Sequence, residues 1–265
     1  MNPMFAVQIT GRDDRELHKT VDALKAAGLD YETFGCIPFT DEITNLEAFP
    51  SDRRVIPLAG TKVLSMWQRG CLPPNWHVFY DAGHLDQYLA QRFYGTNLLN
   101  YWAEVRPFSQ MKDRVWDVPM FVKPTDDGKA FAGLVLEGES LSQALEKQTH
   151  QVIADDQPIL VSDCKTLGRE FRLFVVDGYV VDISEYRNRG QIQHKDVAPR
   201  LKADLRDYFQ SVCHPSAPRA YVMDVGEVWK NGEWRWCIIE LNCFNCSGAY
   251  TVDRAAVYGA VANAI

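Results

Sequence analysis

The segment YVMDVGEVWKNGEWRWCIIELN, from Tyr221 to Asn242, carries the clearest structural pattern of the chain. Two runs rich in β-branched and aromatic residues flank the dipeptide Asn231-Gly232. Such a dipeptide supplies the positive backbone angles of a tight hairpin turn. The segment therefore predicts two antiparallel strands, Tyr221 to Val228 and Trp234 to Leu241.

Three polar side chains of this hairpin are candidate metal ligands. Glu240 and Asn242 are two residues apart, so on a strand both side chains point to one face. Asp224 lies on the other strand and approaches Glu240 if the pairing register allows it. Two carboxylates and an amide oxygen suit magnesium, which keeps some water ligands and bridges substrate phosphates. The alternative is that Asp224 and Glu240 are ordinary surface carboxylates.

A second hairpin lies upstream, where Asp177-Gly178 separates predicted strands over Glu170 to Val176 and Tyr179 to Tyr186. Arg172 is two residues from Glu170 and shares its face. A guanidinium at this position could grip a phosphate. It could equally form an internal salt bridge with Glu170.

A predicted strand from Ile159 to Ser162 stops at Asp163, in a short polar loop before Gly168. A loop at the end of a strand can offer backbone groups to the edge of an adenine. Asp163 or Glu170 could then accept the hydroxyls of a ribose.

Lys123 follows a short predicted strand, Met120 to Val122, and precedes a polar turn from Thr125 to Lys129. A second strand, Phe131 to Leu136, completes a hairpin with a flexible loop. An ammonium at a strand end is a good point charge for a phosphate oxygen. Lys129 and the backbone amides of the loop would add positive potential over a triphosphate.

The first part of the chain predicts an α/β lobe, because strands alternate with helices. Asp13 and Glu16 resemble a capping box at the start of a helix, and Gly28 is suited to its end. The remaining elements expected in the chain are strands at 5–9, 31–34 and 55–58, helices at 61–69, 85–94, 140–151 and 201–212, and a connector at 95–118. The fold class is thus α+β or α/β, with an antiparallel C-terminal sheet and covering helices.

Composition narrows the functional classes. The 265 residues have a formal net charge of −7, whereas a general nucleic-acid binder needs a basic surface. No apolar run approaches the roughly 20 residues of a membrane helix, and Met1 to Thr10 lack a secretory pattern. Seven irregularly spaced cysteines indicate a reducing compartment. We expect a cytoplasmic protein with no nucleic-acid or membrane partner; the pattern does not indicate an oligomeric state.

Taken together, these motifs resemble the ATP-grasp family, over roughly Met120 to Tyr250. The shared elements, in order, are Phe121-Val122-Lys123-Pro124, Gly168-Arg169-Glu170, Asp224 and Glu240-Leu241-Asn242. The phrases from Phe171 to Gly178 and from Ser184 to Arg187 are similar to a bacterial and phage clade with extra arginine and lysine positions.

The resemblance implies an ATP-grasp fold, with an N-terminal lobe at 1–105 and a nucleotide-binding and magnesium-binding region at 106–265. It implies an ADP-forming ligase that activates a carboxylate as an acylphosphate and joins it to an amine, on a small molecule, amino acid or peptide. The implied cofactors are ATP and Mg²⁺. The implied roles are magnesium binding by Asp224, Glu240 and Asn242, nucleotide binding by Lys123, Lys129, Asp163 and Glu170, catalysis by Arg172 and Arg187, and acceptor or acylphosphate contacts by Asn245 and Ser247.

The sequence departs from the family in two places. The loop from Thr125 to Gly133 is poorer in glycine and serine than usual, and a second phosphate-binding lysine upstream is not evident, so that Lys129 is the candidate replacement. Three other functions are considered. Cys243-x-x-Cys246 could be a redox or zinc motif. A nucleic-acid ligase would need Lys-x-Asp-Gly, which Lys123-Pro124-Thr125-Asp126 does not supply. A nucleotide-binding module without turnover is the third.

Overall fold

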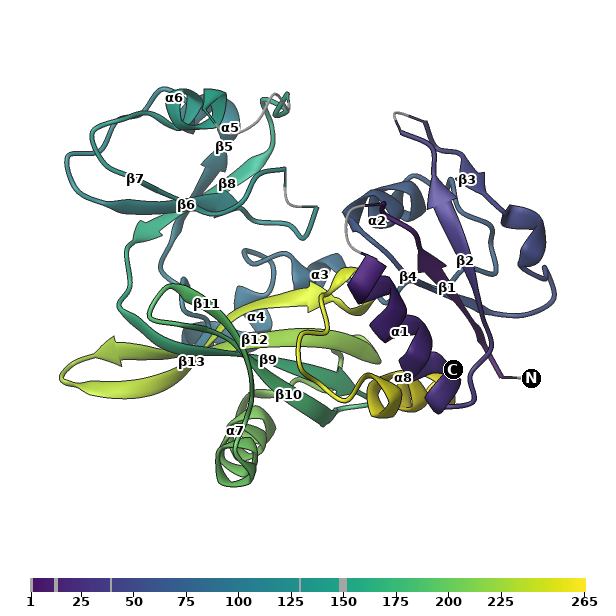
Figure 1. Cartoon of the computed structure of the whole chain (residues 1–265). Coiled ribbons are helices and arrows are strands. Elements are labelled where there is room, and N and C mark those ends of the chain that lie inside the picture. Colours follow the sequence, from purple (N-terminus) through teal and green to yellow (C-terminus); the bar gives the residue numbers. More distant parts are fainter. Residues whose placement is uncertain (1, 12–13, 39, 129, 148–151) are drawn as a thin grey trace.

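The structure is a computed structural model that describes residues 2–11, 14–38, 40–128, 130–147 and 152–265 (Figure 1). Within these residues the strands form three sheets. Figure 1 shows the middle sheet above the C-terminal sheet, with the N-terminal lobe beside them. None of the described helices has both the length and the apolar composition of a membrane-spanning segment.

The N-terminal sheet has the strand order β3-β2-β1-β4, and β1 runs parallel to both β2 and β4. The chain leaves β1 toward β2 on one side and later returns to place β4 on the other. Gly28, at a φ of +65°, ends helix α1 as predicted, but Asp13, the proposed cap of that helix, lies outside the described residues. The elements are β1 (Met4–Gln8), α1 (Asp14–Ala26), β2 (Tyr31–Cys36), β3 (Ile43–Thr44), η1 (Leu46–Ala48), β4 (Val55–Leu58) and α2 (Thr61–Gln68).

The middle sheet is antiparallel, in the order β5-β8-β6-β7. Its first strand falls within the segment expected to be a connector, and β7 is shorter than the strand predicted from Phe131. The predicted capping box of Ser140 and Gln143 is present, whereas the predicted end of this helix near Gln151 lies outside the described residues. The elements are β5 (Glu104–Pro107), α5 (Phe108–Met111), β6 (Met120–Pro124), β7 (Leu134–Leu136), α6 (Leu141–Glu146) and β8 (Pro158–Asp163).

The C-terminal sheet is antiparallel, in the order β11-β10-β9-β12-β13. Both predicted hairpin turns form, with positive φ at Asp177-Gly178 and at Asn231-Gly232. The elements are β9 (Leu167–Val176), β10 (Tyr179–Asn188), β11 (Gln191–Asp196), α7 (Pro199–Val212), β12 (Ala220–Lys230), β13 (Glu233–Cys243), η3 (Phe244–Cys246) and α8 (Arg254–Asn263).

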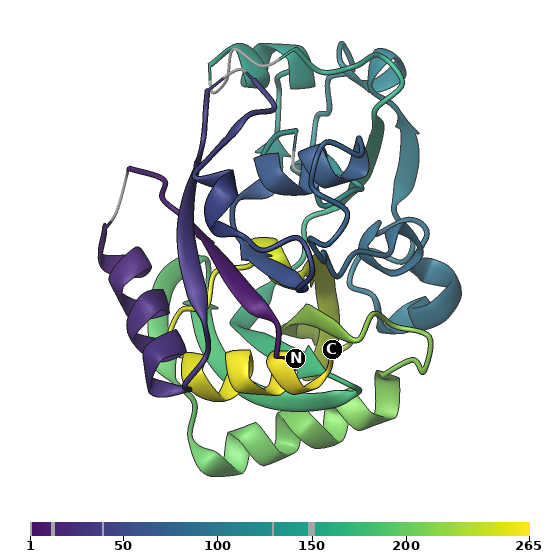
Figure 2. The same ribbon diagram turned by 90° about the vertical axis from the view of Figure 1, so that its right-hand side faces the viewer.

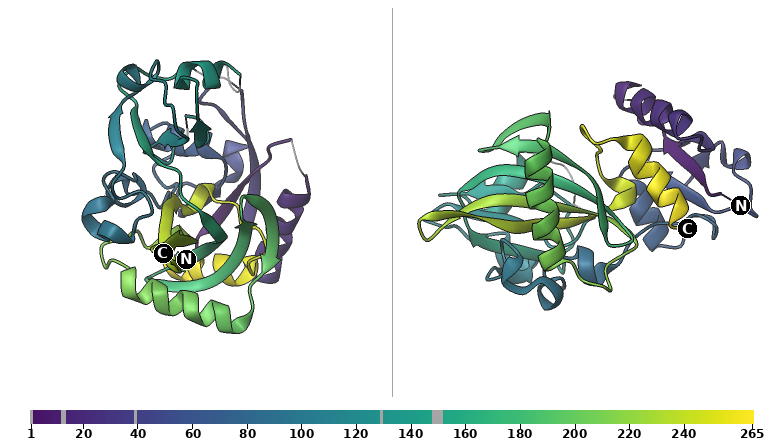
Figure 3. Two further views of the ribbon diagram at one scale, coloured as in Figure 1. Left: turned by 90° about the vertical axis from the view of Figure 1, so that its left-hand side faces the viewer. Right: turned by 90° about the horizontal axis from the view of Figure 1, so that it is seen from below.

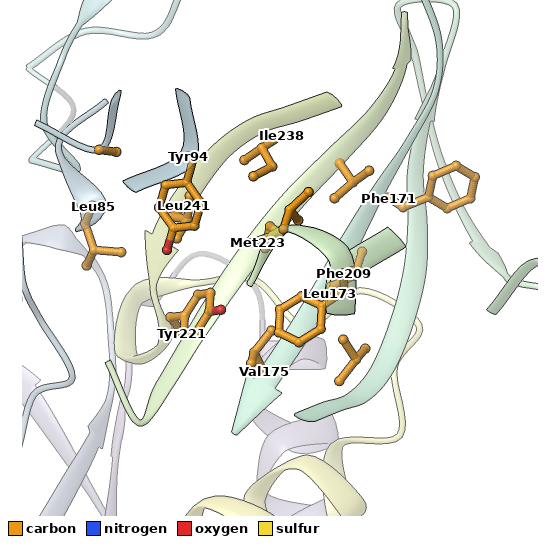
Figure 4. Packing of buried hydrophobic residues seen from close by; sticks show 14 of the residues in the cluster. Leu85, Tyr94, Phe171, Leu173, Val175, Phe209, Tyr221, Met223, Ile238 and Leu241 are labelled. Atoms are coloured by element: carbon orange, nitrogen blue, oxygen red, sulfur yellow. The ribbon is translucent and has the colours of Figure 1, made fainter. Parts of the chain in front are cut away.

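One face of the C-terminal sheet is apolar where it meets α7 and the segment around Leu85 and Tyr94. Leu173 and Met223 are fully buried there against Phe209 of α7 (Figure 4). Figure 3 shows α7 lying across this face. Because burial of apolar surface contributes about 25 cal/mol per Å², this layer fixes the sheet that carries the polar residues of the opposite face.

The opposite face of the same sheet is divided into two parts. At one end Phe174 and Val222 pack under α8, which lies beside α1 (Figure 2). At the other end the same strands carry the polar residues Glu170, Arg172 and Asp224. The change from apolar to polar along one face places a hydrophilic surface opposite the middle sheet.

The predicted helix from Leu85 to Tyr94 is wrong. The segment forms two single-turn helices, α3 (Ala82–Leu85) and α4 (Gln91–Tyr94), followed by η2 (Gly95–Asn97). Asp86 separates them because its side-chain oxygen Oδ1 accepts hydrogen bonds from the backbone N–H groups of Tyr88 and Leu89, each at 2.9 Å. An aspartate that binds the backbone in this way favours a turn over a continuing helix.

Candidate functional site

The hairpin of β12 and β13 brings Asp224 and Glu240 side by side. Asp224 pairs directly with Glu240 on one side and with Arg172 of β9 on the other. Ile239 is the extra residue of a β-bulge next to Glu240, since Asp224 pairs with Glu240 and Val225 with Ile238. The register on which the predicted metal set depends is therefore the observed one.

Arg172 and Asp224 form a buried ion pair. The Nε and Nη2 atoms of Arg172 donate to the two carboxylate oxygens of Asp224 at 2.9 and 2.7 Å. Only 7% of Arg172 and 2% of Asp224 are exposed. Burial alone would lower the pKa of Arg172, but the charge of Asp224 and its hydrogen bonds raise it above the ordinary value. This ion pair, rather than one between Glu170 and Arg172, is formed on this face of the sheet.

Asn242 and the loop after β13 complete the surroundings of this pair. Asn242 Nδ2 donates to Asp224 Oδ2 at 3.2 Å, which assigns the amide oxygen as the atom of Asn242 suited to a cation. Arg172 Nη1 donates to the backbone oxygen of Gly248 at 3.3 Å. The guanidinium also lies 4.9 Å from the ring centre of Tyr250 and 5.5 Å from that of Tyr186.

Lys123 faces this cluster from the middle sheet. Its Nζ donates to Glu240 Oε2 at 2.5 Å, and both side chains are partly buried. Lys123 lies near the end of β6, whereas Glu240 lies on β13, so the ion pair joins two different sheets. The predicted phosphate ligand and one of the predicted metal ligands therefore meet in the gap between the sheets.

Glu170 and Arg187 extend the cluster toward β10. Tyr186 donates to Glu170 Oε2 at 3.0 Å. Burial raises the pKa of Glu170, and the charges of Asp224 and Glu240 act in the same direction, against the hydrogen bond from Tyr186 and the charge of Arg187. The Nε atom of Arg187 is buried without a hydrogen-bond partner among the described residues. An unpaired buried guanidinium N–H is costly, and an anion bound here would satisfy it.

The loop after β6 lies against the end of β13. Asp127, which is buried, accepts a hydrogen bond at 2.7 Å from the backbone N–H of Cys243, next to Asn242. A side chain at Gly133 would place its Cβ 2.8 Å from the ring of Phe121, so the chain needs a glycine to pass there. Lys129 lies outside the described residues.

Asp163 lies at the end of β8, where the chain crosses from the middle sheet to the C-terminal sheet. Its side chain is 85% exposed, 3.8 Å from Lys165. Beside it is a cavity of about 460 Å³. Part of its lining comes from the connector before β5, from the end of β8 and from β12 and β13, including Trp102, Ser162, Asp163, Lys165, Val228 and Cys237.

A second cavity, of about 320 Å³, lies between the N-terminal sheet and the loop after β13. It is lined at the carboxyl ends of β1 and β4, where the strand order reverses, which is the usual binding position in open α/β sheets. Its polar lining includes Gln8, Thr10, Glu16, Ser247, Gly248 and Arg254. Gly248 also bonds Arg172, so the cavity adjoins the charged cluster.

Asn245 is held in the wall between these parts. Its Oδ1 accepts from the backbone N–H of Phe79 at 2.8 Å, and its Nδ2 donates to the backbone oxygen of Pro57 at 2.8 Å. These contacts tie the loop after β13 to the N-terminal lobe. Ser247 lies in the same loop, where its hydroxyl donates to the backbone oxygen of Cys243 at 2.8 Å.

The cysteines of the Cys243-x-x-Cys246 motif are free thiols. A hydrogen bond with Cys246, followed by burial, raises the pKa of the Cys243 thiol well above its ordinary value. Within the described part of the chain, no three His, Cys, Asp or Glu side chains form a cluster that could hold a metal ion. Asp224, Glu240 and Asn242 include only two such side chains, so a metal there would need further oxygen ligands from water or a substrate.

Several residues at this site were missed from the sequence. Tyr186 and Tyr250 flank Arg172, and their rings stack with centroids 5.7 Å apart. Tyr186 falls within a segment quoted for the family resemblance, which was the available signal. Asp86 and Gln87 reach the site from the N-terminal lobe, and no pattern in the sequence indicated this because the contacts depend on tertiary packing.

Comparison with known proteins agrees with this geometry. Residues 101–260 match an ATP-grasp domain family, family 2 of the arginine–lysine clade. A RimK domain protein ATP-grasp from Sphaerobacter thermophilus has a similar structure, with a TM-score of 0.55, 14% identity, and coverage of 96% of this chain and 98% of that chain. The ATP-grasp ligase PsnB, complexed with a minimal precursor, gives a TM-score of 0.51 at 12% identity, with 99% of each chain covered. None of the curated proteins searched matches the chain.

Proposed function

Because this chain belongs to the ATP-grasp domain family, in family 2 of the arginine–lysine clade, we propose that it is an ATP-dependent, ADP-forming ligase that joins a carboxylate to an amine. Both the family and the fold inferred from the motifs are confirmed. The observation that carries the activity is the approach of Lys123 to Glu240 between two sheets, beside the buried pair of Arg172 and Asp224.

Asp224, Glu240 and Asn242 are the proposed magnesium ligands. The donor set fits, because all three offer hard oxygen atoms from adjacent strands. Arg172 occupies one lone pair of each Asp224 oxygen, so Asp224 has less capacity for a metal than Glu240. Magnesium, when bound with the nucleotide, would neutralise charge on the phosphates. For Glu240 to contribute, its ion pair with Lys123 has to open.

The nucleotide is proposed to lie between the middle and C-terminal sheets. Lys123 would bind the α and β phosphates, with Lys129 covering the triphosphate. Glu170 would accept the ribose hydroxyls, and the loop at Asp163 would meet the base. The cavity of about 460 Å³ beside Asp163 offers space for a base at this crossing. The unpaired Nε of Arg187, among the described residues, supports an anion near the other end.

The proposed chemistry has two steps. An oxygen of the substrate carboxylate attacks the γ-phosphorus of ATP, the bond to the bridging oxygen breaks, and ADP leaves an acylphosphate. The amine nitrogen then attacks the acyl carbon, loses a proton and displaces phosphate. Arg172 and Arg187 would hold the transferred phosphoryl group and the carboxylate together, which is mainly charge compensation and positioning.

The acceptor is proposed to bind in the cavity of about 320 Å³, whose size suits an amino acid or the end of a peptide. The N-terminal lobe, 1–105, would supply one wall, and the ATP-grasp region, 106–265, would supply the loop with Ser247 and Asn245. Asn245 would act by holding this loop, given its backbone contacts. The free cysteines suit the proposed location in the cytoplasm.

The test is ADP formation from ATP and Mg²⁺ over a panel of amino acids and short peptides, with product masses recorded. We expect a product whose mass equals acid plus amine minus water. Glu240→Ala should abolish magnesium-dependent turnover in a folded protein, and Lys123→Ala should mainly weaken nucleotide affinity. Unchanged ADP formation by Glu240→Ala would refute the metal assignment. ATP binding without ADP release over the whole panel would instead favour a non-catalytic nucleotide-binding module.

A further inference from the structure

Gln87, in the turn between α3 and α4, contacts both sheets that form the charged site. Only 4% of the residue is exposed. Its backbone N–H donates to the backbone oxygen of Thr125 at 2.8 Å. Its side-chain Nε2 donates to the backbone oxygen of Ile239 at 3.2 Å. A single residue of the N-terminal lobe therefore holds the loop after β6 and strand β13.

The two contacted residues are close in sequence to the two ends of the ion pair. Thr125 follows Lys123 by two residues, and Ile239 directly precedes Glu240. Ile239 is also the bulged residue of β13, where the ladder is irregular and needs outside support. The position of Gln87 thus sets how far the strand end carrying Lys123 lies from the strand carrying Glu240.

Asp86 strengthens the contact with the loop. Its Oδ2 accepts from the hydroxyl of Thr125 at 2.6 Å, and Thr125 is 2% exposed. Its other oxygen, Oδ1, forms the turn that interrupts the helix between α3 and α4. The helix break therefore has a consequence for the site, because it places Asp86 and Gln87 together at the loop.

The side-chain oxygen of Gln87 indicates a further donor. Oε1 is buried and has no hydrogen-bond partner among the described residues, although Nε2 of the same amide is bonded. An unsatisfied buried acceptor costs roughly 1–3 kcal/mol. A donor that arrives with the bound substrate, such as an ordered water, would remove this cost.

We propose that Gln87 is a positioning residue that sets the spacing of Lys123 and Glu240 for a magnesium–nucleotide complex. This rests on the proposed function. A ligand that bridges the two groups requires them at a defined separation, since misplacement of binding groups lowers affinity and rate together. A ligand without phosphates, such as adenosine, does not bridge them and is indifferent to the spacing.

The test compares Gln87→Met with Gln157→Met. Gln157 is a suitable control, because its Nε2 binds Asp126 of the same loop at 2.7 Å, whereas its described hydrogen bonds do not reach β13. Calorimetry of the full-length variants should show that Gln87→Met weakens the binding of Mg·ATP about tenfold, with adenosine affinity within about twofold of the wild type. Gln157→Met should change both by less than about twofold.

Hydrogen exchange of the protein alone provides a readout that does not depend on ATP. Gln87→Met should speed amide exchange at 124–128 and 238–243 about tenfold, and Gln157→Met should leave 238–243 unchanged. Unchanged exchange in Gln87→Met, or an equal loss of adenosine and Mg·ATP affinity, would overturn the proposal. If the wild type binds no Mg·ATP while Gln87→Met still loosens both segments, the spacing role stands and the proposed ligase function fails.

Discussion

The acidic residues of the site each lie beside a basic residue. Desolvating a charge is costly, and a nearby opposite charge with good geometry offsets that cost. The cluster therefore remains compensated when no substrate is bound, and a substrate has to exchange one partner for another. The pairs are Lys123 with Glu240, Arg172 with Asp224, and Arg187 beside Glu170.

Removing one member of the buried pair should be far more damaging than removing both. Asp224→Leu leaves the guanidinium of Arg172 buried without its partner, so we expect the free energy of unfolding to fall by about 3–5 kcal/mol. The double variant Arg172→Met/Asp224→Leu should recover most of this loss. Urea unfolding of the three proteins measures both effects. A double variant as unstable as Asp224→Leu would show that the ion pair is not the source of the loss.

Glu170 predicts a pH dependence of stability. Burial raises its pKa in the folded protein, so the folded state holds this proton more tightly than the unfolded state. The resulting stabilisation is fully present below the ordinary pKa of a glutamate and is lost as the pH rises through the raised value. Glu170→Gln, which keeps an acceptor for Tyr186, removes this dependence.

We therefore expect Glu170→Gln to gain stability relative to the wild type as the pH rises from about 4 to about 7. Denaturant unfolding at several pH values in this window measures the difference between the two proteins. A difference that stays constant, or that shrinks as the pH rises, would contradict the raised pKa. Tyr186→Phe in the same series separates the contribution of the hydrogen bond from that of burial.

At the scale of elements, hairpin turns and helices place opposite demands on glycine. Gly178 has a φ of +79°, Gly259 lies inside α8, and a Cβ added at either glycine would meet no other atom within 4 Å. Gly178→Ala should destabilise the protein by roughly 1 kcal/mol, because L-residues avoid this backbone region. Gly259→Ala should stabilise it by up to about 1 kcal/mol, because alanine favours a helix.

Thermal or urea unfolding of the two variants gives opposite shifts if this is correct. Shifts of the same sign would mean that contacts rather than backbone conformation determine the outcome. The comparison is clean because neither new methyl group meets a neighbouring atom.

The elements also show where local patterns suffice. The Asp-Gly and Asn-Gly turns set both C-terminal hairpins, because the backbone angles of a two-residue turn are a local property. The capping box of Ser140 is local in the same way. The helix predicted from Leu85 failed, because apolar spacing does not register that Asp86 binds the backbone of Tyr88 and Leu89.

At the scale of the whole molecule, the site is assembled from three parts. Lys123 comes from the middle sheet and Glu240 from the C-terminal sheet, and Gln87 of the N-terminal lobe contacts β13 beside Glu240. A ligand that binds across these parts stabilises their arrangement as well as its own contacts. Binding should therefore be visible in global unfolding.

Mg·ATP at about 100 times its dissociation constant should add about 2.7 kcal/mol to the stability. For a chain of this size we expect a rise in melting temperature of about 5 to 10 °C. ATP with a chelator should give a smaller rise, and Glu240→Ala should lose the difference between the two conditions. Equal shifts with and without magnesium would argue against a metal shared by protein and nucleotide.

The closeness of Asp224 and Glu240 was predictable, since a two-residue turn at Asn231-Gly232 fixes which residues of the two strands lie opposite. The position of Lys123 against Glu240 was inferred only through the family resemblance. No register relates strands of different sheets, and 117 residues separate the two side chains.

By itself, the sequence determined the two C-terminal hairpins, the α/β character of the first lobe and the order of polar residues along the strands, because turns, caps and strand periodicity act over a few neighbouring residues. Only the tertiary structure decided that Arg172 pairs with Asp224, that Asp127 reaches Cys243 and that Gln87 holds both sheets. These contacts depend on how separately formed layers pack, which side-chain volume and buried charge settle for the whole chain at once.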